Sequence, residues 1–175
     1  MQGVEIREAG PGDFGDICAL NVASAALTSS MDLERLTVLD ELSCYHKVAC
    51  VDGQVAAFLL AIRSGAAYEN DNFAWFSARH PDFVYVDRIV VSEAFRSEKL
   101  GTRLYEDLFR FATECGCPLV TCEYNISPPN EPSRRFHDRF GFREQGRQWL
   151  AQGSKQVSMQ VAALHSGDPP FRPAT

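Results

Sequence analysis

Residues 83–105 read FVYVDRIVVSEAFRSEKLGTRLY. The first nine are nearly all apolar, which is typical of a strand buried on both faces near the centre of a sheet. A short turn follows, and beyond residue 101 the apolar residues recur at helical spacing. The stretch therefore predicts a buried strand, a turn and an amphipathic helix whose N-terminus directs backbone N–H groups and partial positive charge at one place, which suits a phosphate.

The turn itself carries three cations, Arg96, Lys99 and Arg103, which could neutralise a diphosphate. Gly101 would let a ligand approach the backbone closely. Phosphate-binding turns usually carry further glycines, and here Lys99 stands among these residues, so we expect residue 99 to keep a negative φ with its side chain outward. A charged first helical turn without a ligand remains the alternative interpretation.

The order of strands and helices in the rest of the sequence predicts a mixed α/β domain with a strand–helix–strand unit at its centre. Asp13 is expected to cap the first helix and Asn130 the last one, while Asp52-Gly53 predicts a hairpin turn. A stripe of Leu33, Leu36, Leu39 and Leu42 predicts an apolar face on a second helix. The expected strands are residues 4–7, 46–51, 55–62, 83–91, 118–124, 142–150 and 155–164, and the expected helices start at residues 14, 33, 101 and 131. Residues 125–129 are expected to form a turn.

Residues 63–82 show no period and exceed the usual loop length, which makes them a candidate binding element. Four side chains in this segment are candidates for contact with a substrate: Tyr68, Glu69, Asp71 and Trp75. An irregular loop that packs on the core is the alternative, because aromatic content fits both.

Composition describes one ordinary globular domain over residues 1–164, with a loosely ordered tail at 165–175. The net charge is −6, with five basic and twelve acidic residues in 1–82 against twelve and eleven in 83–175. Such a chain is a poor partner for nucleic acid, and no apolar run is long enough to span a membrane. The six cysteines lack the spacing of a metal site, and the N-terminus lacks a secretory signal, so we expect no metal and a cytoplasmic protein.

Two motifs resemble the acyl-CoA-binding signature of the GCN5-related N-acetyltransferase (GNAT) superfamily. The first family motif is Arg or Gln, two residues, Gly, one residue, and Gly or Ala, and it reads RSEKLG at residues 96–101. The second is Asn, two residues, a small residue, three residues, Tyr and then Gly-Phe, and it reads NEPSRRFH at 130–137 with GF at 141–142. The segment IREAGPGDFGDICAL, residues 6–20, also looks like the first strand and helix of the family.

The resemblance, which covers roughly residues 4–163, implies a single central mixed sheet flanked by helices. In that fold two parallel strands, here residues 85–91 and 119–124, splay apart and hold acetyl-CoA. The diphosphate would rest on the amides after Arg96. The residues that would bind the cofactor are Ile89, Val90, Val91, Arg96, Ser97, Glu98, Lys99, Leu100, Gly101, Thr102, Arg103, Asn125, Asn130 and Ser133.

The chemistry of amine acetylation needs a group that accepts the amine's proton. Asp87 matches a position where several members carry a carboxylate, and an ion pair with Arg88 is the alternative. Glu123 is the rival base. His137 stands where many members carry a tyrosine that protonates the departing thiolate, but a helix-edge histidine bonded to a carbonyl fits equally well. Tyr124 is the alternative acid, and departure of the thiolate without a protein acid is the third possibility.

The sequence thus predicts an acetyl-CoA-dependent N-acetyltransferase that acts by direct transfer on a small-molecule amine, cationic or neutral. A domain that binds coenzyme A without catalysis, as a sensor or interaction module, is the main alternative, and the Lys99 replacement and missing tyrosine favour it slightly. Dimers are frequent in the family, so the resemblance also allows a homodimer.

Overall fold

The computed structural model describes residues 3–26 and 28–165, so the predicted tail lies outside the described residues apart from His165. The strands form one mixed sheet in the order β1-β2-β3-β4-β5-β7-β6. By internal contacts the chain divides into two compact units, residues 1–62 with 86–108 and residues 63–85 with 109–175. The strand β4 (Val84–Val91) and the helix α4 (Leu100–Glu114) each contribute residues to both units.

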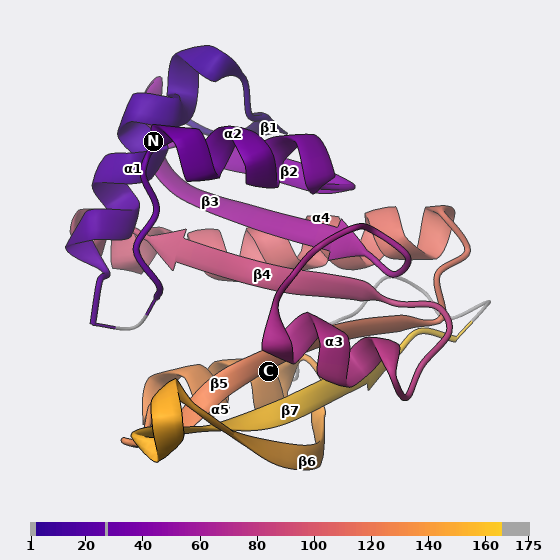
Figure 1. The fold of residues 1–175 in the computed structure, drawn as a ribbon. Coiled ribbons are helices and arrows are strands. Elements are labelled where there is room, and N and C mark those ends of the chain that lie inside the picture. Colours follow the sequence, from indigo (N-terminus) through magenta and orange to yellow (C-terminus); the bar gives the residue numbers. More distant parts are fainter. Residues whose placement is uncertain (1–2, 27, 166–175) are drawn as a thin grey trace. The chain divides into compact units, whose positions relative to one another are not determined.

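The first unit contains the N-terminal strands and two short helices. Its elements are β1 (Val4–Glu8), the 3-10 turn η1 (Pro11–Asp13), α1 (Phe14–Ala23), α2 (Leu33–Leu42), β2 (Tyr45–Val51), β3 (Gln54–Arg63) and the 3-10 turn η2 (Glu93–Glu98), together with most of β4 and the first part of α4. β1, β2 and β3 pair antiparallel, and Figure 1 shows them in indigo to magenta. The predicted hairpin is confirmed, since Asp52 and Gly53 join β2 to β3 with φ values of 49° and 85°, as the two-residue turn requires.

Alternation along β2 places the helices of this unit on opposite faces. His46 lies on the α1 and α2 side, where its Nδ1 is 2.6 Å from the Asp40 carboxylate and its ring packs near Phe14. Tyr45 and Lys47 lie on the other face, and both donate hydrogen bonds to Asp107 of α4. Successive side chains of a strand point to opposite faces, so β2 alone fixes this arrangement.

The second unit is built around β5 (Leu119–Ser127). It also contains α3 (Asp71–Ser77), α5 (Glu131–Arg139), β6 (Arg143–Leu150), the turn η3 (Ala151–Gly153) and β7 (Lys155–Ala163). β5 runs parallel to the start of β4, with Val84 opposite Val120, and antiparallel to β7. The predicted strand–helix–strand unit β4–α4–β5 is therefore confirmed. Neighbouring residues of β5 again face opposite ways: Glu123 lies on the α3 side and Tyr124 on the α5 side, where its ring is 5.6 Å from that of His137.

Two predictions about local structure were wrong. Residues 63–82 are not irregular throughout, because Asn70 caps the helix α3 by accepting a hydrogen bond from the backbone N–H of Phe73 at 3.0 Å. Seven residues are too few to show a helical period in the sequence. The expected turn at 125–129 begins late, because β5 continues to Ser127 through an irregularity between Asn125 and Ser127.

Two expectations about the first helices also need correction. Asp13 precedes α1, but its carboxylate accepts hydrogen bonds from the Gly10 N–H and the Arg7 guanidinium instead of capping α1. In α2 the apolar stripe is narrower than predicted, since Leu36 and Leu39 are buried while Leu33 is 57% exposed. Asp32, in contrast, caps α2 as a normal N-cap residue, 2.8 Å from the Arg35 N–H. No helix in the described part of the chain is long and apolar enough to cross a bilayer.

Candidate active site

The turn between β4 and α4 is the first part of the site. η2 ends at Glu98, and Lys99 then adopts a left-handed conformation with φ 55° and ψ 33°. Its carbonyl accepts the first hydrogen bond of the helix, from the N–H of Arg103 at 3.1 Å, so Lys99 is the residue directly before α4. The expectation that residue 99 keeps a negative φ was therefore wrong. Lys99 stands where the family motif has a glycine, and it keeps a backbone conformation that glycine adopts freely. For a residue with a Cβ this conformation costs roughly 1–2 kcal/mol of strain.

The charges of this turn leave it suited to an anion. Arg96 forms an exposed ion pair with Glu93 at 2.8 Å, and Ser97 bonds weakly to Glu98 at 3.4 Å. Lys99 and Arg103 add two further cations. The first N–H groups of α4, at Leu100, Gly101 and Thr102, have no partner within the helix by its geometry, and they carry its positive dipole end. A helix of fifteen residues that starts in this way, with three cations around it, fits the diphosphate of acetyl-CoA.

The end of β4 carries Ile89, Val90 and Val91, which the resemblance assigns to acetyl-CoA binding. Burial alternates there: Val90 is 3% exposed, whereas Ile89 and Val91 are half-buried. Ile89 and Val91 therefore share the less covered face of the strand. Their role toward the cofactor remains a prediction.

Asp87 lies in a buried ion-pair cluster. Its side chain is 3% exposed, and its Oδ2 accepts a hydrogen bond from the Arg88 Nε at 2.7 Å. The Arg88 guanidinium also donates to Asn21 Oδ1 at 3.0 Å and to the carbonyl and hydroxyl oxygens of Ser29 at 3.1 Å. This is the ion-pair alternative that the sequence left open, and it ties β4 to α1 and to the connection that follows α1.

Glu123 has different surroundings. Its Oε1 accepts a hydrogen bond at 3.0 Å from the hydroxyl of Tyr85, which is 1% exposed. The neighbouring strand residue on the same side is Thr121, which pairs with Tyr85 across β4 and β5. The hydroxyl of Tyr85, a neutral donor, thus bonds to this carboxylate.

His137 is buried, with 4% exposure, and its Nδ1 lies 2.7 Å from the Ser133 carbonyl oxygen. Nδ1 must carry the proton, because a carbonyl can only accept. Burial lowers the pKa of His137 to about 4, so the ring is neutral near pH 7. This geometry is that of the carbonyl-bonded alternative, and it gives the imidazole no proton to donate from a charged form.

Tyr124, the other candidate acid, points its hydroxyl toward β7. The Gln160 Nε2 donates to it at 3.2 Å, and burial raises the pKa of Tyr124. Gln160 also donates to Ser158, whose hydroxyl donates to Glu144 of β6. This polar chain links β5, β7 and β6, and it holds the phenol among structural partners.

The remaining residues of the second motif are structural in the observed geometry. Asn130 caps α5 by accepting from the Ser133 N–H at 3.3 Å, as predicted. The Asn125 carbonyl accepts from the Asn130 N–H at 3.0 Å and closes the turn before α5. The predicted contacts of Asn125, Asn130 and Ser133 with the cofactor stay predictions.

The four candidate substrate residues divide into two kinds. Tyr68 is 7% exposed and packs edge-on against Phe73 with ring centroids 5.5 Å apart, as a core residue does. The Trp75 ring lies so close to β6 that a Cβ on Gly146 would come within 2.5 Å of it, and the Arg79 guanidinium stacks on its other side at 3.7 Å. Glu69 and Asp71 are exposed. Tyr68 and Trp75 thus anchor α3 within the second unit.

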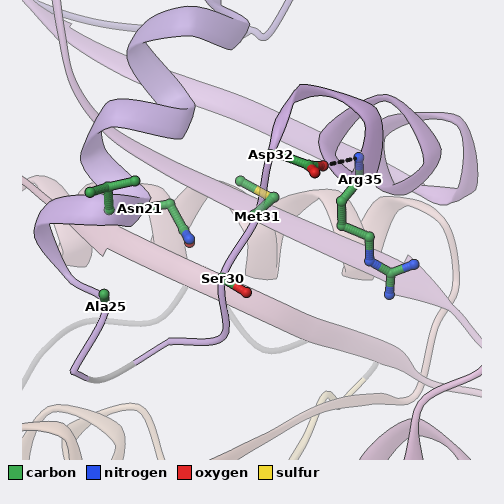
Figure 2. A pocket seen from close by; sticks show the side chains of 7 residues that line it. Asn21, Ala25, Ser30, Met31, Asp32 and Arg35 are labelled. Atoms are coloured by element: carbon green, nitrogen blue, oxygen red, sulfur yellow. Dashed lines mark hydrogen bonds between the residues drawn. The ribbon is translucent and has the colours of Figure 1, made fainter.

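A hollow of about 430 Å³ in the first unit was not predicted from the sequence. Asn21 and Met31 point toward each other across it, and Asp32 and Arg35 supply one charge of each sign at the start of α2 (Figure 2). Val22, Ala25 and Ser30 complete the lining. The lining residues come from α1, from the connection between α1 and α2, and from α2. No periodicity in the sequence relates them. The only signal in the sequence was the acidic character of the first half of the chain.

The chain belongs to the acetyltransferase (GNAT) family, whose model matches residues 18–142. The family transfers acetyl groups and uses acetyl-CoA, and the fold and cofactor predicted from the two motifs are thereby confirmed. No curated protein sequence matched the chain.

Solved structures show the same fold at low sequence identity. Ard1 from Thermoplasma volcanium is 17% identical over 93% of this chain and 98% of its own, with a TM-score of 0.74. The ribosomal-protein-S18-alanine N-acetyltransferase from Escherichia coli is 13% identical over 97% and 100%, with a TM-score of 0.70. The putative acetyltransferase yncA from Salmonella typhimurium, solved with its cofactor acetyl-CoA, is 20% identical over 96% and 98%, with a TM-score of 0.69.

Proposed function

We propose that this protein is an N-acetyltransferase that moves the acetyl group of acetyl-CoA to a primary amine on a small molecule, by direct transfer while both substrates are bound. The observation that carries this proposal is the turn before α4, which keeps a left-handed residue at position 99 even though a lysine occupies it. A strained backbone conformation persists where the surrounding structure holds it, and such positions gather at functional sites.

The cofactor is held by this turn in our proposal. Acetyl-CoA supplies an activated acyl group as a thioester. Backbone N–H groups of Leu100, Gly101 and Thr102 would bind its diphosphate, and Lys99 and Arg103 would balance the charge. The exposed Arg96 can exchange Glu93 for a phosphate, because an exposed ion pair contributes little to the free energy of folding.

We assign the proton acceptor to Glu123 and not to Asp87. The Asp87 carboxylate is buried and already engaged by the Arg88 guanidinium at 2.7 Å, so it is committed to that partner. Glu123 accepts one proton from the amine nitrogen as the C–N bond forms. The C–S electron pair leaves with sulfur, which takes a proton from water, and Glu123 returns its own proton to water.

Within the first unit, the hollow beside α2 would serve as a ligand site. Its volume suits a compact ligand, and the Asp32 carboxylate offers a partner for a cationic group. Met31, which is 5% exposed, gives the hollow an apolar surface. These features support a small cationic or neutral metabolite as the ligand of this hollow.

Turnover tests the proposal directly. The protein is mixed with acetyl-CoA and a panel of small amines, and free thiol is followed with time. We expect thiol release that depends on one class of amine. Tight acetyl-CoA binding by calorimetry without turnover on any amine would replace the enzyme with a coenzyme A-binding module, and absence of binding would reject both.

A further inference from the structure

A tyrosine and a glutamate from neighbouring parallel strands meet on one face of the sheet in the second unit. The hydroxyl of Tyr85 in β4 is 3.0 Å from Oε1 of Glu123 in β5. An ionised carboxylate only accepts hydrogen bonds, so the phenol is the donor. Nothing in the two motifs of the family includes this pair.

The Tyr85 ring is buried and packs against two aromatic rings of α3. It lies 5.7 Å from Phe73 and 6.0 Å from Phe76, both in α3, and it is 1% exposed. Phe83, which precedes it in the chain, packs on the same two rings. A phenol buried in this way has a single place for its oxygen, and the carboxylate bonded to it is correspondingly fixed.

We propose that Tyr85 is a positioning residue that holds the Glu123 carboxylate ready to accept the proton of the acceptor amine. This inference rests on the proposed function for its catalytic part. A carboxylate has about four lone-pair positions, so a donor at Oε1 leaves the carboxylate able to accept a proton as well. The hydrogen bond fixes the direction of the carboxylate, and its neutral donor does not compete for the charge as Arg88 does at Asp87.

Among the described neighbours of the pair, Met159 faces Glu123 across β5 and β7, α3 contributes the exposed Asp71 at its start, and the carboxylate of Asp87 stands two positions beyond Tyr85 in β4. Hydrogen bonding to the ionised form favours that form. Removal of the phenol oxygen therefore makes Glu123 bind its proton at a higher pH than in the parent protein.

The test is Tyr85→Phe, which removes one oxygen and keeps the ring. In protein labelled with ¹³C at the glutamate carboxyl carbon, the Glu123 resonance is identified by its loss in Glu123→Gln, and its titration is followed by NMR without acetyl-CoA or amine. We expect the midpoint to rise by about one pH unit in Tyr85→Phe. With both substrates present, kcat should fall roughly tenfold, with the acid limb of the pH profile moved the same way and calorimetric acetyl-CoA affinity unchanged.

Phe73→Leu is the matched control, because it loosens the same ring without touching the carboxylate. It should lower the melting temperature and leave the Glu123 midpoint in place. An unchanged midpoint in folded Tyr85→Phe would overturn the proposal, as would an equal shift in Phe73→Leu. A shifted midpoint in a protein that acetylates no amine would leave the pair standing and reject the catalytic role of Glu123, so the two failures are distinguishable.

Discussion

Two arginine–carboxylate pairs flank the end of β4, and they differ in little except burial. Arg88 and Asp87 are 2.7 Å apart with side chains 6% and 3% exposed, while Arg96 and Glu93 are 2.8 Å apart with side chains 68% and 84% exposed. The first pair lies in the strand and bonds to Asn21 and Ser29. The second lies in the turn that we assign to the cofactor.

The difference shows that burial, and not distance, decides what an ion pair does. In water an exposed pair contributes at most about 1 kcal/mol and its members can change partners. For a buried pair, the cost of removing both charges from water is offset only by the contacts of the pair, so each member stays bound to the other. The exposed arginine is therefore available to a ligand, and the buried carboxylate stays bound to its own arginine.

The largest effect is expected from removing the buried cation. Arg88→Met should destabilise the protein by about 3–5 kcal/mol, because it leaves the Asp87 carboxylate buried without its partner. Arg96→Met should change stability by less than about 1 kcal/mol. Urea denaturation of both variants measures the contrast, and similar losses from the two would remove the distinction between the pairs.

A buried titrating group should give the next largest effect. The pKa of His137 is lowered by burial from 6.5 to about 4, so the unfolded chain binds more protons between these values. Stability is then fully present above pH 6.5 and falls by about 3 kcal/mol as the pH drops toward 4.

Thermal melts from pH 7 to pH 4 measure this loss, and His137→Phe should flatten the curve over that window. The Arg7 guanidinium lowers the pKa of Asp13 to about 2, so the contribution of Asp13 disappears only below pH 4 and does not overlap. If the melting temperature falls equally with pH in the parent protein and in His137→Phe, His137 is not the buried titrating group.

The exposed turn should respond in binding more than in stability. Gly101→Val should weaken acetyl-CoA binding at least about tenfold, because a branched Cβ would stand beside the N–H groups that we assign to the diphosphate. Gly101→Ala, which the family motif permits, is the control and should bind nearly as the parent does. Calorimetry measures the acetyl-CoA affinity of both variants. Unaltered affinity in Gly101→Val would mean that the cofactor binds elsewhere.

The smallest effect is expected at the left-handed residue itself. Lys99→Gly should raise the free energy of unfolding by about 1 kcal/mol, since glycine adopts φ 55° without the strain that a Cβ brings. Acetyl-CoA affinity should change far less than in Gly101→Val. A loss of acetyl-CoA affinity as severe as that in Gly101→Val would mean that the Lys99 ammonium itself binds the cofactor.

Elements with a strong local pattern were predicted well. The apolar run of β4, the Asp52-Gly53 turn and the cap Asn130 each depend on neighbours in sequence. The helix α3 was missed because its evidence lies in packing: Phe73 and Phe76 contact Tyr85, and Asn72 bonds to Gln148 of β6. Such contacts join residues far apart in the chain, and no window of sequence displays them.

The sequence by itself determined the family and the sheet with its central β4–α4–β5 unit, because strand and helix periods and two spaced motifs are local properties. It also indicated the turn that we assign to the cofactor. Only the tertiary structure decided which carboxylate is committed to an arginine and which to a phenol, and that His137 is neutral. Partner and burial set the ionisation of a side chain. Both depend on residues brought together by folding: Arg88 with Asn21 and Ser29, and Tyr85 with Glu123.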